Sequence, residues 1–210
     1  RYYNADGGEA EMCGNGARCF GNFAAALLHH DKTAPLPFET MAGVVTATFE
    51  KDGNVTVNLT NPHSMQLFVL NADPTVGADV HFLNTGVPHA VAFLDKLEGL
   101  DISRLGAYLR YHEAFSPKGT NANFARILSP GHIAIRTYER GVEDETLACG
   151  TGMTACALLH AVLTDAPSPI QVDVAGGDTL KVGFQRTGDR FTDVTLTGPA
   201  DLVFTGDIQI

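Results

Sequence analysis

The sequence has 210 residues and is acidic, with 24 Asp and Glu against 14 Lys and Arg and a formal net charge of -10. This charge disfavours binding to nucleic acid or to an anionic membrane surface, and no basic stripe opposes it. No apolar run reaches the roughly 18 residues that a membrane-spanning helix requires. We therefore expect a cytoplasmic protein with neither a nucleic-acid nor a membrane partner.

The chain contains four cysteines, Cys13, Cys19, Cys149 and Cys156, and no Cys-x-x-Cys pair. Their low density is unlike that of secreted disulfide scaffolds, so we expect thiols in a reducing compartment. The cysteine spacings match no zinc-ligand pattern, and no motif for an organic cofactor is present. We therefore expect neither a metal nor a cofactor.

The first predicted element follows the segment Cys13-Gly14-Asn15-Gly16. Residues 17–30 are apolar in nearly every direction of a helical wheel, which predicts a helix over Ala17–His30. A helix that is apolar all round must be enclosed on all sides. We therefore expect a sheet that wraps around it.

Strands are expected to supply that enclosure. Val44–Glu50 and Val55–Leu59, joined by an Asp52-Gly53 turn, predict a β-hairpin. Farther along, a helix is predicted over Ser103–His112, with Ser103 as its N-cap. The other predicted strands are Ser64–Leu70, Val87–Leu94, Asn123–Leu128, His132–Glu139, Ile170–Val174, Thr179–Gln185, Phe191–Leu196 and Leu202–Phe204.

The first cysteine motif recurs as Cys149-Gly150-Thr151-Gly152, which opens a second, almost uncharged helix over Met153–Leu163. The repetition indicates two related halves, and the fold class is mixed α and β. Cys19 and Cys156 lie inside the two helices without flanking glycines, so we expect both in the core.

Each Cys-Gly-x-Gly motif combines a base with a binding site for an anion. The N–H groups and the dipole at a helix start stabilise the negative charge of a thiolate. The glycines leave the backbone bare, so its N–H groups can approach a bound carboxylate closely. If one thiolate removes an α-proton and the opposite thiol returns a proton to the other face, the α-carbon of an amino acid is inverted. A buried cysteine beside a glycine turn explains one such motif, but not two matching ones.

On these motifs the sequence resembles the diaminopimelate epimerase family. The segment Asn4-Ala5-Asp6-Gly7-Gly8-Glu9 with Met12–Cys19 resembles the first family signature, and Glu139–Gly152 resembles the second. Further matches are Asn61-Pro62-His63, Gly86–His89, Gly119–Phe124 and Gly198-Pro199-Ala200. The resemblance covers essentially the whole chain in the order of the family.

The resemblance implies an α/β fold of two pseudo-symmetric domains, each a curved mixed sheet wrapped around a central buried helix. We expect residues 1–61 with 199–210 to form the N-terminal domain, and residues 62–198 to form the C-terminal domain. The resemblance also implies a homodimer that needs no cofactor and interconverts L,L- and meso-diaminopimelate in lysine biosynthesis.

The resemblance further assigns roles to residues of this sequence. Cys13 and Cys149 are the acid/base pair, and His63 supports them. Backbone N–H groups hold the reacting carboxylate, and they belong to Gly14, Asn15, Gly150 and Thr151. Glu139 helps to hold the α-ammonium. The other amino-acid end of the substrate is recognised by Asn4, Asn61, Asn121 and Arg140.

Taken singly, these residues also have ordinary structural interpretations. Asn61 and Asn121 stand in contexts typical of turns, and His63 resembles a packed histidine. Glu139 and Arg140 are also compatible with a surface ion pair, which would contribute little. Four residues are assigned structural roles by default: His89, His112, Arg18 and Asn123.

Two alternative functions stay open. The first is a two-thiol racemase for proline or histidine, although a one-ended substrate would leave Arg140 and the asparagines unpaired, at about 1–3 kcal/mol. The second is a non-catalytic amino-acid-binding module, because the Gly-Asn-Asp-Phe segment of the family is absent and we expect a segment to precede Arg1. The second signature also has one residue more between Glu139 and Cys149 than the commoner Glu-Arg-Gly-x-Gly-x-Thr form.

Overall fold

The computed structural model describes residues 1–3, 7–10 and 13–207, which divide between two compact units. The first unit is Arg1–Asn58 with Thr197–Ile210, and the second is Leu59–Leu196. Each unit combines strands with at least one helix, as the mixed class predicts. The domain boundaries expected from the sequence, 61/62 and 198/199, remain a proposal.

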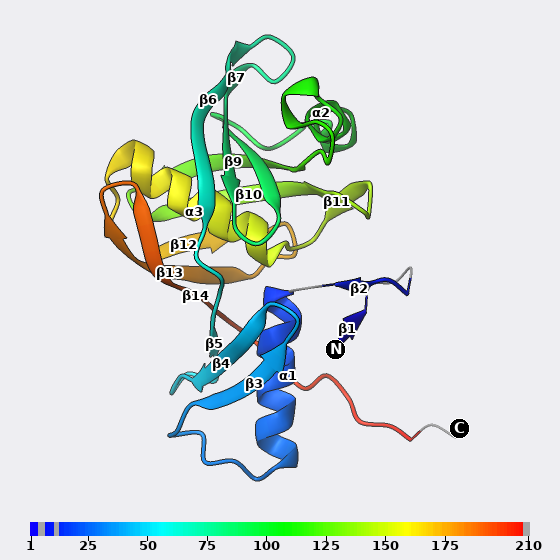
Figure 1. Cartoon of the computed structure of the whole chain (residues 1–210), viewed down its shortest axis with the longest axis vertical. Helices are drawn as coiled ribbons and strands as arrows, with labels where there is room; N and C mark the ends of the chain where they lie inside the picture. Colours follow the sequence, from blue (N-terminus) through cyan, green and yellow to red (C-terminus); the bar gives the residue numbers. More distant parts are fainter. Residues whose placement is uncertain (4–6, 11–12, 208–210) are drawn as a thin grey trace. The chain divides into compact units, whose positions relative to one another are not determined.

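The first unit packs one helix against a three-stranded meander (Figure 1). Its strands β3, β4 and β5 pair antiparallel in chain order, and α1 contacts all three. The predicted hairpin is confirmed, and its turn holds Gly53 at φ +90°, which glycine adopts without steric cost. The elements are β1 (Tyr2–Tyr3), β2 (Glu9–Ala10), α1 (Gly14–Leu27), β3 (Leu36–Thr40), β4 (Gly43–Phe49) and β5 (Val55–Asn58).

Helix α1 buries one face only. Its Gly21 approaches the meander so closely that an added Cβ would lie 2.7 Å from the Cβ of Ala47. On the helix surface, Phe23 and Leu27 are 58% and 66% exposed. The prediction that this helix is enclosed on all sides is therefore wrong for the described residues, because the meander covers one side. Cys19, which was predicted to lie in the core, is exposed.

The second unit contains a long mixed sheet and two further helices. The strand order is β14-β13-β12-β10-β9-β8-β7-β6, and β11 pairs with β10. The β8–β9 and β10–β12 pairs are parallel. The strands are β6 (His63–Asp73), β7 (Ala78–Asn84), β8 (Pro88–Phe93), β9 (Asn121–Ser129), β10 (His132–Glu139), β11 (Asp144–Thr146), β12 (Ile170–Asp173), β13 (Thr179–Thr187) and β14 (Arg190–Gly198). The helices are α2 (Ile102–Arg110), a 3-10 turn (Glu113–Phe115) and α3 (Gly150–Thr164).

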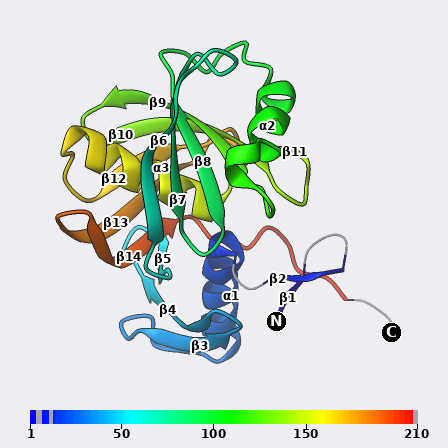
Figure 2. The ribbon, with the colours of Figure 1, turned by 45° about the horizontal axis from the view of Figure 1, so that its top comes forward.

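Helix α3 lies within the curve of this sheet (Figures 1 and 2). Every residue from Gly150 to Ala161 is buried, and the helix contacts strands β7, β8, β9, β10, β12 and β13. This confirms the prediction of an enclosed second helix, since an almost uncharged sequence can be surrounded without burying unpaired charge. None of the helices in the described part of the chain is long and apolar enough to cross a membrane.

Helix α2 covers the other face of the sheet. Leu105 and Leu109 of α2 pack with Ala122, Phe124 and Tyr138 in one buried cluster. Because side chains alternate along a strand, the residues that flank Ala122 and Phe124 point to the face that carries α3. Strand β9 is therefore buried on both faces over Asn121–Ala125.

The edge strand β6 has a backbone irregularity at every fourth residue. Ser64, Phe68 and Ala72 adopt φ values of +57°, +56° and +43°, and the register with β7 shifts within each interval. The backbone N–H of Phe68 leaves the ladder and donates to Nδ1 of His81 at 3.2 Å. The strand is therefore repeatedly bulged, with a buried histidine accepting one of the displaced N–H groups.

Two local predictions are corrected by the structure. The N-cap of α2 is Asp101, whose Oδ1 accepts from the backbone N–H of Arg104 at 3.0 Å, whereas Ser103 lies within the helix. The predicted strand Leu202–Phe204 is irregular and exposed, because the described chain offers it no pairing partner. Strands β1, β2, β3, β7 and β11 were not predicted. Pro37 interrupts the apolar pattern of β3, and β1, β2 and β11 have only two or three residues each. In β7 the alternation of Ala78, Val80 and Phe82 with polar residues is a strand pattern that sequence reasoning missed.

The contact between α2 and β10 depends on the absence of a side chain at Gly106. A Cβ there would lie 2.2 Å from the Cβ of Tyr138. We predict that Gly106→Ala lowers the free energy of unfolding by about 3 kcal/mol, because the helix must move off the sheet. Arg104→Ala, on the exposed side of the same helix, should change it by less than about 0.5 kcal/mol. Urea unfolding of both variants measures the difference, and equal values would contradict the close contact.

Candidate functional site

Cys149 is the N-cap of α3 and is 7% exposed. Its backbone is extended, and its carbonyl accepts the helical hydrogen bond from Met153 at 2.8 Å. Its Sγ lies 3.5 Å from Oγ1 of Thr151. Gly150 and Thr151 follow in the first turn, where N–H groups have no intrahelical acceptor. The thiol and these N–H groups therefore occupy one helix start, as predicted.

The start of α3 is pressed against the sheet at Gly152. A Cβ on this residue would lie 2.4 Å from Oδ1 of Asn123 and 3.4 Å from Sγ of Cys149. The position therefore requires glycine, because a side chain would displace either the first turn of the helix or the amide of β9. This contact fixes the height of the Cys149 helix start above the sheet.

A strip of polar side chains lies on the sheet face below this helix start. It comprises alternate residues of three neighbouring strands, and cross-strand pairs His89–Asn121 and Asn123–Thr137 place them side by side. Within it, Thr137 donates to Oδ1 of Asn123 at 3.0 Å. We call this set the polar strip; its members are His89, Asn121, Asn123, Thr137 and Glu139.

The hydrogen bonds of Asn123 fix the tautomer of His89. The Nδ2 of Asn123 donates to the carbonyl of Ala90 at 3.0 Å and lies 3.1 Å from Nδ1 of His89. Since Nδ2 is a donor, Nδ1 of His89 must accept, and its proton resides on Nε2. Burial, with a smaller contribution from the charge of Arg140, lowers the pKa of His89 to about 3. His89 is therefore a neutral, oriented histidine.

Asn121 joins the segments that carry Arg140 and His89. Its Oδ1 accepts from the backbone N–H of Arg140 at 2.8 Å, and its Nδ2 donates to the carbonyl of Pro88 at 2.8 Å. The Arg140 guanidinium also donates from one nitrogen to the carbonyl of Lys118 at 3.3 Å. The structure thus brings Asn121 and Arg140 together, with the asparagine holding the backbone of the arginine.

Glu139 is a half-buried carboxyl at the end of β10. Burial raises its pKa above the ordinary value, and a hydrogen bond from the Thr146 hydroxyl at 3.0 Å opposes this increase. A carboxyl in such surroundings is stabilised in its charged form when a cation is placed beside it. The residue is therefore suited to a bound ammonium.

Cys13 is the N-cap of α1 in the first unit. Its Sγ accepts from the backbone N–H of Gly16 at 3.3 Å, which is the geometry of a capping side chain. Arg18, buried in the next turn, donates to Oδ1 of Asn15 at 3.0 Å and lies 3.5 Å from the carbonyl of Gly14. The two predicted thiols thus have the same position at the start of a helix. None of the four cysteines forms a disulfide.

The other predicted residues are placed differently. Asn4 lies outside the described residues. Asn61 is exposed, shortly before β6 begins. His63 is also exposed, and its Nδ1 lies 2.9 Å from the hydroxyl oxygen of Ser64. Within the described residues, no group of three or more His, Cys, Asp or Glu side chains is placed to bind a metal ion.

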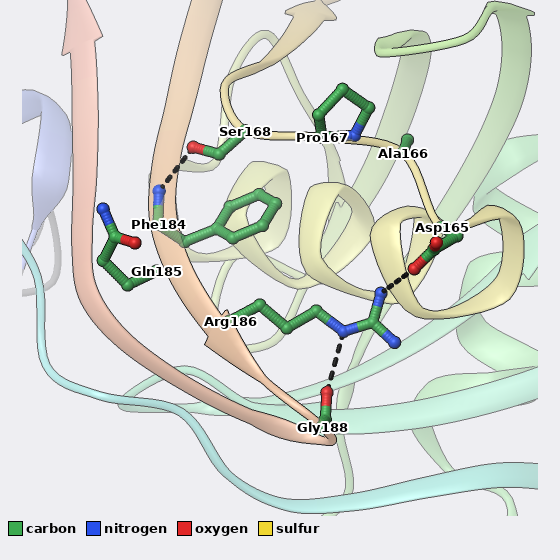
Figure 3. A pocket seen from close by; sticks show the side chains of 8 residues that line it. All are labelled: Asp165, Ala166, Pro167, Ser168, Phe184, Gln185, Arg186 and Gly188. Atoms are coloured by element: carbon green, nitrogen blue, oxygen red, sulfur yellow. Dashed lines mark hydrogen bonds and ion pairs between the residues drawn. The ribbon is translucent and has the colours of Figure 1, made fainter.

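A pocket of about 470 Å³ lies at the opposite end of α3 (Figure 3). Arg186 reaches into it from β13 and donates to the carbonyls of Ala161 and Gly188 and to the Asp165 carboxylate. The bond to Ala161 caps the C-terminus of α3, since carbonyls of the last turn lack helical donors. The pocket is the whole length of the helix away from Cys149, and its cation is already engaged.

Comparison with known proteins decides the family. The sequence pattern of diaminopimelate epimerase matches residues 1–65 and 81–203. The chain belongs to the diaminopimelate epimerase family. The diaminopimelate epimerase of Hydrogenobaculum sp. (strain Y04AAS1) is 43% identical over 98% of this chain and 73% of its own length. That of Aquifex aeolicus is 42% identical over 99% of this chain and 73% of its own length.

Solved structures confirm the fold class that the resemblance implied. A probable proline racemase from Agrobacterium radiobacter has a TM-score of 0.67 at 20% identity, over 93% of this chain and 67% of that protein. A PhzF-family phenazine biosynthesis protein of Bacillus anthracis has a TM-score of 0.66 at 14% identity, over 92% of this chain and 74% of that protein. At these identities the similarity concerns the fold alone.

Two residues of the polar strip were given only structural roles by sequence reasoning. His89 and Asn123 belong to the sheet face beneath the Cys149 helix start; Asn123 forms the close contact with Gly152, and its amide lies 3.1 Å from Nδ1 of His89. The signal was present in the alternation Asn121-Ala122-Asn123-Phe124, which places two amides on one face and two apolar side chains on the other. The sequence does not reveal that the apolar helix α3 packs on the face of β9 that carries these two amides.

The two motif glycines provide a matched test of the Cys149 helix start. We predict that Gly152→Ala lowers the free energy of unfolding by about 1–3 kcal/mol, because its Cβ would clash with Asn123. At the equivalent position, a Cβ on Gly16 would lie 3.3 Å from the exposed ring of Tyr2, which can move. Gly16→Ala should therefore change stability by less than about 1 kcal/mol. Calorimetric unfolding compares the two variants; a greater loss for Gly16→Ala would contradict this assignment.

The neutral state of His89 predicts a pH dependence of stability. A histidine in the unfolded chain has a pKa of about 6.5 and is protonated below that pH. In the folded protein His89 stays neutral down to about pH 3, so the unfolded chain binds one more proton in this range. The stabilisation is complete above pH 6.5 and decreases as the pH falls toward 3. Between pH 7 and pH 5 the wild type should lose about 2 kcal/mol more than His89→Gln.

Urea titrations at the two pH values measure this difference. His29→Gln, at an exposed position, is the control and should retain the pH dependence of the wild type. If the free energy of unfolding of His89→Gln changed with pH as steeply as that of the wild type, His89 would take up its proton in the folded state as well, and the prediction would be wrong.

Proposed function

We propose that this chain interconverts L,L- and meso-diaminopimelate by proton transfer at one α-carbon, with Cys13 and Cys149 as the acid/base pair. The observation that carries the proposal is the repeated helix start headed by a cysteine, found in a member of the diaminopimelate epimerase family. The curated relatives, at 40–43% identity over nearly the whole chain, support this substrate.

In the proposed reaction, the thiolate of one cysteine removes the α-proton and the thiol of the other protonates the opposite face of the same carbon. The α-proton of an amino acid is very weakly acidic, so the developing negative charge must be stabilised. The N–H groups of Gly14, Asn15, Gly150 and Thr151 are suited to this, because they stand in the first helical turns. Loss of a single preorganised donor typically costs about 3 kcal/mol of transition-state stabilisation.

The remaining polar groups are assigned to the amino and carboxylate groups of the substrate. We assign the α-ammonium to Glu139, because a neighbouring cation would stabilise the charged form of its half-buried carboxyl. The distal amino-acid end is assigned to Arg140 with Asn121, Asn61 and Asn4, and His63 supports the reacting centre. A guanidinium binds a carboxylate through two parallel hydrogen bonds, which favours a substrate with a second carboxylate. A one-ended amino acid such as proline or histidine would leave this group unused.

We further propose that the protein is cytoplasmic, acts in lysine biosynthesis as a homodimer and requires no metal or organic cofactor. The family resemblance supports these assignments, and thiols in place of disulfides are consistent with a reducing compartment.

The cysteine assignment predicts opposite stereochemical asymmetries in two variants. In deuterated water the protein should incorporate deuterium at Cα of diaminopimelate. Cys13→Ser should slow exchange from one stereoisomer more than from the other, and Cys149→Ser should show the reverse preference. Each variant should lose about 10²- to 10⁴-fold in overall epimerisation, which is the typical contribution of a positioned proton-transfer group. Initial exchange rates followed by NMR from each stereoisomer provide the measurement.

Cys19→Ser is the matched control, since this exposed thiol lies on the same helix as Cys13 and should retain activity. Absence of exchange in the purified full-length protein with its thiols reduced would overturn the proposed function. Binding of diaminopimelate without exchange would favour the non-catalytic module, and faster turnover of proline or histidine would favour the racemase.

A further inference from the structure

The turn between β10 and β11 contains a strained acidic residue. Glu143 has φ +59°, a left-handed conformation that is unfavourable for a residue with a side chain. Its backbone N–H donates to the carbonyl of Glu139 at 2.8 Å, which closes the turn around Arg140. Such strain persists only where surrounding contacts hold the residue in place.

The side chain of Glu143 provides those contacts. Its Oε1 accepts from the backbone N–H of Gly141 and from Nε of Arg110, both at 3.1 Å. Its Oε2 accepts from the hydroxyl of Tyr111 at 3.0 Å and lies 3.4 Å from that of Tyr138. Burial alone would raise the pKa of Glu143, but the donors Gly141, Tyr111 and Arg110 hold it below the ordinary value. The carboxylate therefore ties the turn to the end of α2 and to β10.

These contacts position Arg140 from both sides. Its own N–H is bound by Asn121, and the next N–H in the chain, that of Gly141, is bound by Glu143. The Arg140 and Arg110 guanidiniums also share the carbonyl of Lys118, at 3.3 and 3.5 Å. In the described part of the chain the Nε and second terminal nitrogen of Arg140 have no hydrogen-bond partner, so a bidentate face is available for a carboxylate.

We propose that Glu143 is a positioning residue for substrate recognition, which acts by holding Arg140 in the orientation that binds the distal carboxylate of the substrate. The inference rests on the proposed function for the identity of that carboxylate. A simple surface ion pair with Arg110 would contribute little and would not require the left-handed backbone. The convergence of donors from α2, β10 and the turn itself distinguishes Glu143 from such a pair.

Two substitutions distinguish the effect of the Glu143 side chain from the effect of its left-handed backbone. Glu143→Gly relieves the left-handed conformation and removes the anchor, whereas Glu143→Gln keeps the size and removes the charge. Both should raise KM for L,L-diaminopimelate about tenfold with kcat within about threefold, because uniform binding is lost and proton transfer is not. Affinity for L-lysine, which lacks the distal carboxylate, should stay within about twofold of the wild type.

Glu145→Gln is the matched control. Glu145 lies two residues farther along and pairs with Arg136 at 2.6 and 2.7 Å, apart from the contacts of Arg140. This variant should keep the wild-type KM. A wild-type KM in Glu143→Gly, or a fall in kcat without a change in KM, would overturn the proposal; so would an equal loss of affinity for L-lysine.

Amide hydrogen exchange of residues 139–146 in the unliganded protein provides a readout independent of catalysis. Faster exchange in Glu143→Gly than in Glu145→Gln would support the anchor, and equal protection would overturn it. If the wild-type protein does not exchange the α-proton of diaminopimelate, the proposed function fails. The hydrogen-exchange result then still decides whether Glu143 holds the turn.

Discussion

The close approach of α3 to the sheet at Gly152 is the contact on which the second unit depends. The helix is almost uncharged and is surrounded by strands, so it can be buried without leaving charge unpaired. At its start, however, it must bring polar N–H groups and a thiol into the same interior. The glycine allows the backbone to rest on Asn123, and the polar strip makes that interior hydrogen-bonded instead of apolar. The contact between Gly152 and Asn123 therefore both packs the helix on the sheet and places the Cys149 helix start beside the polar strip.

The site could be predicted from the sequence only in part. The equivalence of Cys13 and Cys149 follows from a repeated four-residue pattern, and both residues are N-caps in the structure. Arg140 and Asn121 were predicted as well, but the hydrogen bond by which Asn121 holds the backbone of Arg140 was not. Asn121 has the hydrogen-bonding capacity of a substrate ligand, and nothing in its local sequence reveals that both ends of its amide bind backbone groups. The role of Glu143 depends on a turn conformation and on α2, far away in the chain.

The fold was predicted best where the pattern was local. The hairpin around Gly53 and the helix behind Cys149 have signals that a short window contains. The sequence of α1 is similarly apolar, but an apolar sequence indicates only that a helix can be buried, not that it is. In the described structure the strands cover one side of α1. Asp101 rather than Ser103 caps α2 because either side chain fits a capping role, and the choice depends on where the chain enters the helix.

The irregularity of β6 also has a consequence for how molecules of this protein meet in solution. An unpaired strand edge is a template on which another chain can add a strand, and this leads to aggregation. The left-handed residues Ser64, Phe68 and Ala72 interrupt the outward row of N–H and C=O groups every fourth residue. A straight strand from a second molecule therefore cannot pair along β6 for more than a few residues. The strain in this strand favours solubility at the edge of a large sheet.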